Sequence, residues 1–151
     1  MENKMKQGGC ECGSVRYQFT GEPLTCYACH CTDCQTSSGS AFTLSMIVNS
    51  QDVEVIEGAL SINTLNNNGI EVKRHHCPRC GTGLWYSADA YPNIYALKPG
   101  TFDDKKWFKP IAHLWVRSAQ PWVLLDEHTK KYQKQPEMSE LFELWAKREN
   151  A

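Results

Sequence analysis

Cysteine is the residue type most able to do chemistry in this chain, because its eight cysteines gather in three tight clusters. Thiols two or three residues apart can bring their sulfur atoms to one tetrahedral metal ion, and Zn²⁺ is the ion that such sets usually bind. The clusters contain, in chain order, Cys10 and Cys12, then Cys26, Cys29, Cys31 and Cys34, then Cys77 and Cys80. Eight thiolates could form two closed four-cysteine sites. They could instead form one closed site and a second site with three ligands and an open position, which could perform catalysis.

The first and third clusters together make a complete four-thiolate set. Cys10 and Cys12 are two residues apart, so in an extended chain both sulfurs project to one face. Cys77 and Cys80 form a Cys-x-x-Cys knuckle, and the following Gly81 permits the tight turn that a knuckle needs. Four thiolates leave zinc no open position, so we expect a structural zinc site here. A redox Cys-x-x-Cys is the alternative, but it gives Cys10 and Cys12 no role.

The middle cluster allows more than one interpretation. Cys29 and Cys31 share the two-residue spacing, and Cys34 completes a second knuckle with Cys31. Three thiolates would leave a coordination position for water or an incoming thiol, whose pKa zinc would lower. Cys26 could instead supply a fourth thiolate and close the site. A thiol redox centre and an iron–sulfur cluster are further alternatives, although the spacing does not match the usual ferredoxin pattern.

Polar residues beside these clusters are candidates for smaller roles. His30 would point away from the ion in an extended segment, so we expect it to pack or to support a ligand. We expect His75 and His76 to be ordinary strand residues, and Asp33 could be a proton acceptor or a solvated carboxylate. The sequence Ser-Ser-Gly-Ser at 37–40 could hold a substrate carboxylate on exposed amides, but an ordinary turn is the simpler interpretation.

The overall composition bounds the kind of molecule that carries the clusters. The chain has 151 residues and a hydrophobic fraction of 41%, which suits one soluble domain with a real core. A net charge of −1 favours neither nucleic acid nor an anionic membrane as a partner. Residues 1–7 lack the apolar stretch of a secretory signal, and no apolar run approaches the roughly 20 residues that span a bilayer. We therefore expect a cytoplasmic protein with reduced cysteines.

Short strands dominate the predicted secondary structure. Residues 14–20 alternate apolar and polar side chains, as a half-buried strand does. The sequence Asn-Asn-Asn-Gly at 66–69 predicts a hairpin turn. Further strand-like runs occur at 41–48, 52–56, 60–65, 70–76, 83–87, 94–98, 112–117 and 122–125. The pattern predicts a mainly β domain.

The C-terminal segment is the exception to this strand pattern. Apolar residues there repeat at i, i+3, i+4 and i+7, which are Met138, Leu141, Phe142 and Trp145. This period predicts a short amphipathic helix over 136–148 whose apolar stripe packs on the sheet, with Pro136 at the first helical position.

The ordered motifs resemble those of the glutathione-dependent formaldehyde-activating enzyme family, also called the centromere protein V/GFA domain. The matching segments, over about residues 8–135, are Gly8-Gly9-Cys10-x-Cys12-Gly13-x-Val15-Arg16-Tyr17, Cys29-His30-Cys31-x-x-Cys34-Gln35, Ser38-Gly39-Ser40, Cys77-x-x-Cys80-Gly81-Thr82, Pro99-Gly100-Thr101-Phe102-Asp103-Asp104, His113-Leu114-Trp115-Val116 and Pro121-Trp122. The resemblance implies one β-tent zinc-binding domain of short antiparallel strands, spanning 1–151, with two zinc ions per chain.

The resemblance also implies roles for the two sites. Cys10, Cys12, Cys77 and Cys80 would hold a structural zinc, and Cys29, Cys31 and Cys34 a catalytic one. Cys26 lies outside the family's ligand pattern and stays a possible fourth ligand. The implied activity is that of a carbon–sulfur lyase, which condenses glutathione or another small thiol with formaldehyde to an adduct such as S-hydroxymethylglutathione. The alternative is a non-catalytic zinc-binding module with two closed four-cysteine sites that binds a protein partner.

Overall fold

The computed structural model describes residues 5–67 and 69–148, and the chain divides into two compact units. The first unit comprises Met1–Pro23 and Ile47–Trp107, and the second comprises Leu24–Met46 and Phe108–Ala151. Strand β4 (Thr43–Asn49) carries the chain from the second unit into the first. The expectation that both units form a single domain stays a prediction.

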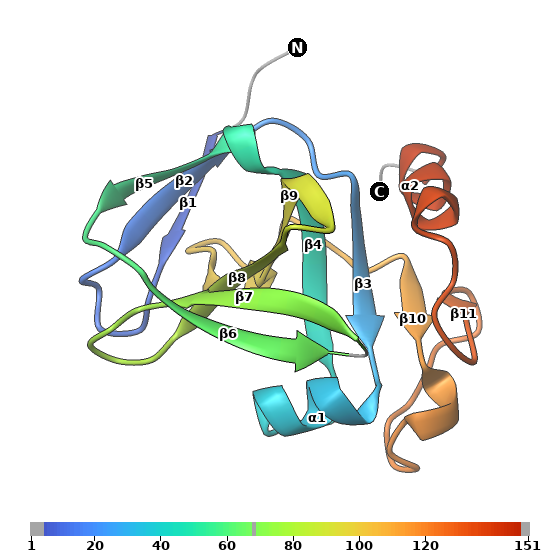
Figure 1. Cartoon of the computed structure of the whole chain (residues 1–151). Coiled ribbons are helices and arrows are strands. Elements are labelled where there is room, and N and C mark those ends of the chain that lie inside the picture. The colour runs from blue at the N-terminus through green and yellow to red at the C-terminus, as the bar shows by residue number, and fades with distance from the viewer. Residues whose placement is uncertain (1–4, 68, 149–151) are drawn as a thin grey trace. The chain divides into compact units, whose positions relative to one another are not determined.

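The first unit contains a three-stranded antiparallel sheet in the order β1-β2-β5 (Figure 1). Its strands are β1 (Met5–Gly9), β2 (Arg16–Thr20) and β5 (Val53–Glu57). Tyr17 and Phe19 of β2 are fully buried, whereas Arg16, Gln18 and Thr20 are partly exposed. The predicted alternation over 14–20 is therefore confirmed, and it turns one face of β2 into the core.

The first unit also contains four consecutive antiparallel strands in the order β9-β8-β7-β6. They are β6 (Ser61–Asn67), β7 (Ile70–His76), β8 (Gly83–Ala88) and β9 (Tyr91–Leu97), and short 3₁₀ turns, η1 (Ser50–Asp52) and η2 (Pro99–Thr101), occur elsewhere in this unit. The amide of Gly69 donates to Asn66 Oδ1 at 2.9 Å in the predicted β6–β7 turn. Asn68, in the same turn, lies outside the described residues.

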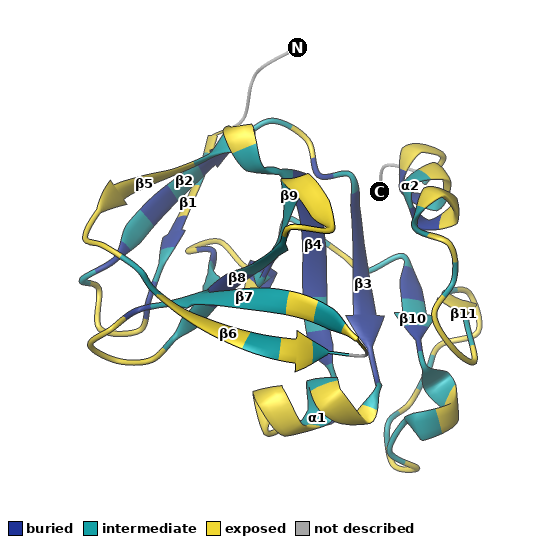
Figure 2. Cartoon of the chain, viewed as in Figure 1, coloured by how far each residue is buried: buried dark blue, intermediate teal, exposed yellow. Residues whose placement is uncertain are grey.

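The second unit combines parallel strand pairs with helices. Strand β10 (Ala112–Leu114) pairs in parallel with both β3 (Thr25–Cys29) and β11 (Lys130–Lys131). Helix α1 (Thr32–Ser38) follows β3, a 3₁₀ turn η3 (Val116–Ser118) follows β10, and helix α2 (Met138–Ala146) packs on β3. Figure 2 shows that β3 is buried along its whole length.

The prediction of a mainly β fold with a short C-terminal helix is confirmed. Helix α2 begins at Met138 with Glu137 as its N-cap, so the expected start at Pro136 is wrong by two residues. The run at 112–117 ends early, because β10 stops at Leu114 and Trp115 adopts a left-handed backbone (φ 60°). Residues 122–125, which are described, form no strand, and the sequence did not indicate β1, β3 or α1. Among the described residues, none of the helices has the length and the apolar character of a membrane-spanning segment.

Candidate metal centres

Four thiols of the first unit meet in one cluster. The sulfur atoms of Cys10, Cys12, Cys77 and Cys80 all lie within 4.8 Å of one another. Cys12 Sγ lies 3.6 Å from Cys10 Sγ and 3.8 Å from Cys77 Sγ. Zinc–sulfur bonds of about 2.3 Å place the corners of a regular tetrahedron about 3.8 Å apart. The donor set and its spacing therefore fit a closed tetrahedral zinc site.

Two tight turns hold these thiols. In the turn between β1 and β2, the Cys10 amide donates to Val15 O at 3.1 Å and the Val15 amide donates to Cys10 Sγ at 3.2 Å. In the loop after β7, the Gly81 amide donates to Cys77 O at 2.9 Å, and Gly81 has the positive φ (82°) that favours glycine. The Cys80 amide also points at Cys77 Sγ (3.4 Å), so both turns aim N–H groups at a sulfur atom.

Two hydroxyl groups at this cluster were not predicted from the sequence. Ser14 Oγ lies 3.0 Å from Cys12 Sγ and 3.3 Å from Cys77 Sγ. Thr82 Oγ1 accepts from the Glu11 amide at 3.1 Å and lies 3.1 Å from Cys80 Sγ, to which it can donate. Hydrogen bonds from Thr82 lower the pKa of Cys80 to about 5. The only sequence feature that could have indicated these hydroxyl groups is their position, because Ser14 and Thr82 each follow a glycine that comes directly after a cysteine.

The second unit brings three further thiols together. The sulfurs of Cys29, Cys31 and Cys34 lie within 4.8 Å of one another, a spacing that fits three corners of a tetrahedral site. Cys29 ends the buried strand β3, and Cys31 is the N-cap of α1. The Cys31 sulfur accepts a hydrogen bond from the Cys34 amide at 3.3 Å. This cluster is called the trio below.

Thiol contacts and burial disfavour the ionisation of Cys29 and Cys31. Hydrogen bonding with Cys34, followed by burial, raises the pKa of Cys29 above its ordinary value. Burial also raises the pKa of Cys31. A bound metal ion reverses this balance, because its charge stabilises thiolates directly. The trio therefore has the donor chemistry of a metal site.

Cys26 is separate from the trio. Among the described residues, the set of mutually close thiols in this unit contains Cys29, Cys31 and Cys34 and does not include Cys26. Both Cys26 and Cys29 lie in β3, and residues three apart in a strand project to opposite faces. Cys26 is fully buried, and burial raises the pKa of its thiol to about 12.

His30 lies between Cys29 and Cys31 in the chain. It is fully buried, its Nε2 lies 2.9 Å from His113 Nδ1, and its ring lies 5.1 Å from that of Phe42, centroid to centroid. Burial, and then the neighbouring His113, lower the pKa of His30, and burial lowers the pKa of His113. The pair is therefore neutral at pH 7, and one ring donates to the other.

The remaining candidates take ordinary structural positions. His75 Nε2 lies 2.8 Å from Ser87 Oγ on the neighbouring strand, and His76 Nδ1 lies 3.5 Å from the Arg74 carbonyl. Asp33 is exposed in the first turn of α1. Residues 37–40 end that helix, with Gly39 as a left-handed C-cap (φ 65°).

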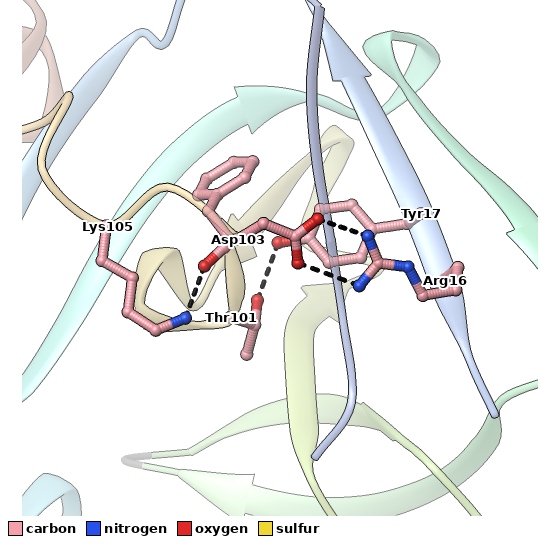
Figure 3. A network of polar contacts seen from close by, with 6 residues as sticks. Arg16, Tyr17, Thr101, Asp103 and Lys105 are labelled. Carbon is pink, nitrogen blue, oxygen red and sulfur yellow. Dashed lines mark hydrogen bonds and ion pairs between the residues drawn. The ribbon is translucent and has the colours of Figure 1, made fainter. Parts of the chain in front are cut away.

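A polar clamp supports the strand that follows the first cluster (Figure 3). Arg16 of β2 donates through both terminal nitrogens to the carboxylate of Asp103, with Nη1 to Oδ1 at 2.9 Å. Thr101 Oγ1 donates to the Lys98 carbonyl, so the Tyr17 hydroxyl donates to Thr101 Oγ1 at 2.7 Å. These contacts connect β2 to η2 and to the loop after it.

This chain is similar to known proteins in sequence and in fold. The chain is 25% identical over 126 residues to a Halomonas elongata protein named "Putative glutathione-dependent formaldehyde-activating enzyme", a match that covers 80% of each chain. A crystal structure of a Rhodobacter sphaeroides protein superimposes with a TM-score of 0.51 at 20% identity, covering 64% of this chain and 87% of that one, and supports the fold. The family model described as "Glutathione-dependent formaldehyde-activating enzyme" matches residues 5–118. The chain therefore belongs to the glutathione-dependent formaldehyde-activating enzyme family.

Proposed function

We propose that this protein is a zinc-dependent carbon–sulfur lyase that forms or cleaves a thiol–aldehyde adduct such as S-hydroxymethylglutathione. The observation that carries the proposal is the division of the cysteines into a set of four and a set of three among the described residues. Cys10, Cys12, Cys77 and Cys80 would hold a structural zinc. Cys29, Cys31 and Cys34 would hold a second zinc, for a cofactor content of two zinc ions per chain.

The chemistry follows from the smaller set. When bound by three thiolates, zinc supplies an open position and the charge that favours a substrate thiolate at neutral pH. The sulfur of a small thiol such as glutathione attacks the aldehyde carbon, and a carbon–sulfur bond forms. The carbonyl electron pair moves to oxygen, which takes up a proton, and the reverse reaction cleaves the same bond. The chain's own part is to hold the three sulfurs together and to leave Cys26 on the other face of β3.

Metal content tests the coordination. We expect two zinc ions per chain by mass spectrometry or elemental analysis. Cys26→Ala is expected to retain both, because Cys26 lies outside the trio. Cys31→Ser is expected to lose the second zinc and keep the first. Loss of the second zinc from Cys26→Ala would instead support a closed, non-catalytic module, and one zinc with an oxidisable trio would support a redox centre.

Activity tests the reaction. Formation of S-hydroxymethylglutathione from glutathione and formaldehyde, followed by exchange NMR, is expected to exceed the uncatalysed rate with the wild-type protein and with Cys26→Ala. It is expected to return to the uncatalysed rate with Cys31→Ser. Serine still caps α1 well, so this variant should stay folded. Equal rates for wild type and Cys31→Ser would refute the lyase proposal.

The same chemistry suggests where the protein works. Both sites need reduced thiols, which persist in the cytoplasm, so we expect a cytoplasmic enzyme with a small thiol and an aldehyde as its partners.

A further inference from the structure

Gln35, one residue beyond the last trio cysteine, has both ends of its side-chain amide in hydrogen bonds to the protein. Its Nε2 donates to the His30 carbonyl at 2.8 Å and to the Ser118 carbonyl at 2.9 Å. Its Oε1 accepts from Gln120 Nε2 at 2.7 Å. Both N–H bonds and the oxygen are thus engaged, and a flipped amide would set oxygen against two carbonyls. The orientation of this side chain is therefore determined.

The residue that Gln35 holds lies between two trio ligands. The His30 amide donates to the Leu114 carbonyl at 2.9 Å, and its Nε2 pairs with His113 at 2.9 Å. Its carbonyl is the group that Gln35 binds. The two backbone hydrogen bonds fix the peptide groups that set the separation of the Cys29 and Cys31 sulfurs, and the ring bond holds the His30 side chain.

The segment that receives Gln35 has an unusual backbone. After β10, Trp115 adopts φ 60° and ψ 39°, a left-handed conformation that costs a bulky residue energy. The chain then makes the 3₁₀ turn η3, whose last residue, Ser118, presents its carbonyl to Gln35. The strained turn thus places an acceptor where Gln35 needs one.

We propose that Gln35 is a positioning residue that holds the trio in metal-binding geometry by tying its backbone to the 114–120 segment. The inference rests on the proposed second metal site. It assigns Gln35 no contact with substrate. Outer hydrogen bonds that orient metal ligands typically contribute 10–100-fold to metal affinity. We expect a loss of about that size when the Gln35 amide is removed.

Three variants test the separate hydrogen bonds of the Gln35 side chain. Gln35→Met removes all three hydrogen bonds at similar volume. Gln35→Glu keeps one oxygen as an acceptor for Gln120 but sets the other carboxylate oxygen against two carbonyls, so it should weaken the site as much. Gln120→Leu removes one contact and leaves both carbonyl contacts, so it should weaken the site less. Thr36→Ala, an exposed change on the same helix, is the matched control.

The decisive measurement is metal binding rather than turnover. Protein with zinc in the four-cysteine site and Co²⁺ in the trio is titrated with a chelator, and the cobalt absorption bands are recorded. We expect both Gln35 variants to bind cobalt about 10–100-fold more weakly than the wild type and to show altered absorption bands. They should still retain zinc in the four-cysteine site. The Thr36→Ala control should bind cobalt as the wild type does. A role in packing alone would lower thermal stability without changing the bands.

The outcomes separate this inference from the proposed function. If Gln35→Met and Gln35→Glu hold cobalt as tightly as the wild type, with the same bands, the positioning role is refuted while the lyase proposal stands. If the wild type binds no metal at the trio, both proposals fail. If the Gln35 variants lose cobalt and Gln120→Leu keeps it, the positioning role is supported, and the carbonyl contacts carry it.

Discussion

At the scale of single residues, hydroxyl groups complete the four-cysteine site. Thr82 connects the two halves of this site, because its Oγ1 contacts both Cys80 Sγ and the Glu11 amide at 3.1 Å. Ser14 Oγ lies against the sulfurs of Cys12 and Cys77. Four thiolates give a zinc site a formal charge of −2, so neighbouring O–H donors stabilise it.

We predict that Thr82→Val weakens metal binding at this site by about 10-fold, because valine has the same shape but cannot donate to Cys80 or accept from Glu11. A chelator titration that follows zinc release measures the change. Thr64→Val, the same substitution on an exposed strand position, is the control. Equal zinc affinity for Thr82→Val and Thr64→Val would show that the hydroxyl has no part in the site.

A pair of glycines sets the close approach of β1 to its neighbours. A Cβ on Gly8 would lie 2.4 Å from the Thr101 carbonyl oxygen, and one on Gly9 would lie 2.4 Å from the Val15 carbonyl oxygen. Backbone atoms cannot move aside as a flexible side chain can, so the strand would have to shift.

We predict that Gly8→Ala lowers the free energy of unfolding by about 2–3 kcal/mol, the upper range for overpacking. Gly83→Ala is the matched control, since among the described residues no heavy atom lies within 4 Å of its added Cβ, apart from its chain neighbours. Chemical denaturation of the two zinc-loaded variants compares them. A Gly8→Ala protein as stable as Gly83→Ala would contradict the close approach.

At the scale of secondary-structure elements, the clamp of Figure 3 connects β2 to the loop after η2. Hydrogen bonding to Arg16 lowers the pKa of Asp103 below its usual range. The folded pKa is the lower one, so the pair stabilises the protein above the unfolded pKa of about 3.9 and loses that effect as pH falls further. The side chain of Asp103 is 56% exposed, so solvent screens the interaction.

We predict that Asp103→Asn costs about 0.5–1 kcal/mol at pH 7, the upper range for exposed pairs, because this pair is bidentate. The difference from wild type should shrink below about pH 4, as Asp103 is protonated in the wild-type protein. Denaturation at several pH values gives this difference. Asp89→Asn removes a single exposed contact with Lys73 (3.3 Å) and should cost less. If the stability difference between wild type and Asp103→Asn grew as the pH fell, the lowered pKa of Asp103 would be contradicted.

At the scale of the whole molecule, the two cysteine clusters that could hold metal ions differ in what they connect. The four-cysteine site joins a turn at residues 10–12 to a knuckle at 77–80, far apart in the chain. The trio spans only residues 29–34, within one local segment. Metal binding at the first cluster would therefore close a long loop, and its free energy would be folding free energy.

We predict that Cys77→Ser unfolds the protein or prevents its expression, whereas Cys31→Ser stays folded. A structural zinc supplies an apparent binding free energy of about 10–16 kcal/mol, which exceeds or matches the whole stability of most domains, about 5–15 kcal/mol. Circular dichroism and thermal denaturation of the two variants make the comparison. A native-like Cys77→Ser protein would show that the first site is dispensable.

Local patterns in the sequence were sufficient for much of this structure. Adjacent side chains determine the alternation of β2, the apolar stripe of α2 and the tight spacing of the cysteine knuckles, so these could be predicted without long-range information. Strand β3 could not, because it is buried on both faces and has no alternation to detect. Without β3, nothing in the sequence placed Cys26 and Cys29 on opposite faces.

Cysteine spacing by itself determined that the chain carries two groups of thiols able to hold metal ions. It did not determine how many thiols each group contains, since that depends on which face of β3 each cysteine occupies. Only the tertiary structure decided this, and only it brought Gln35 to Ser118 and Gln120. The physical reason is sequence distance: a knuckle is formed by neighbours along the chain, whereas the groups that hold it in place come from strands and turns that meet only after folding.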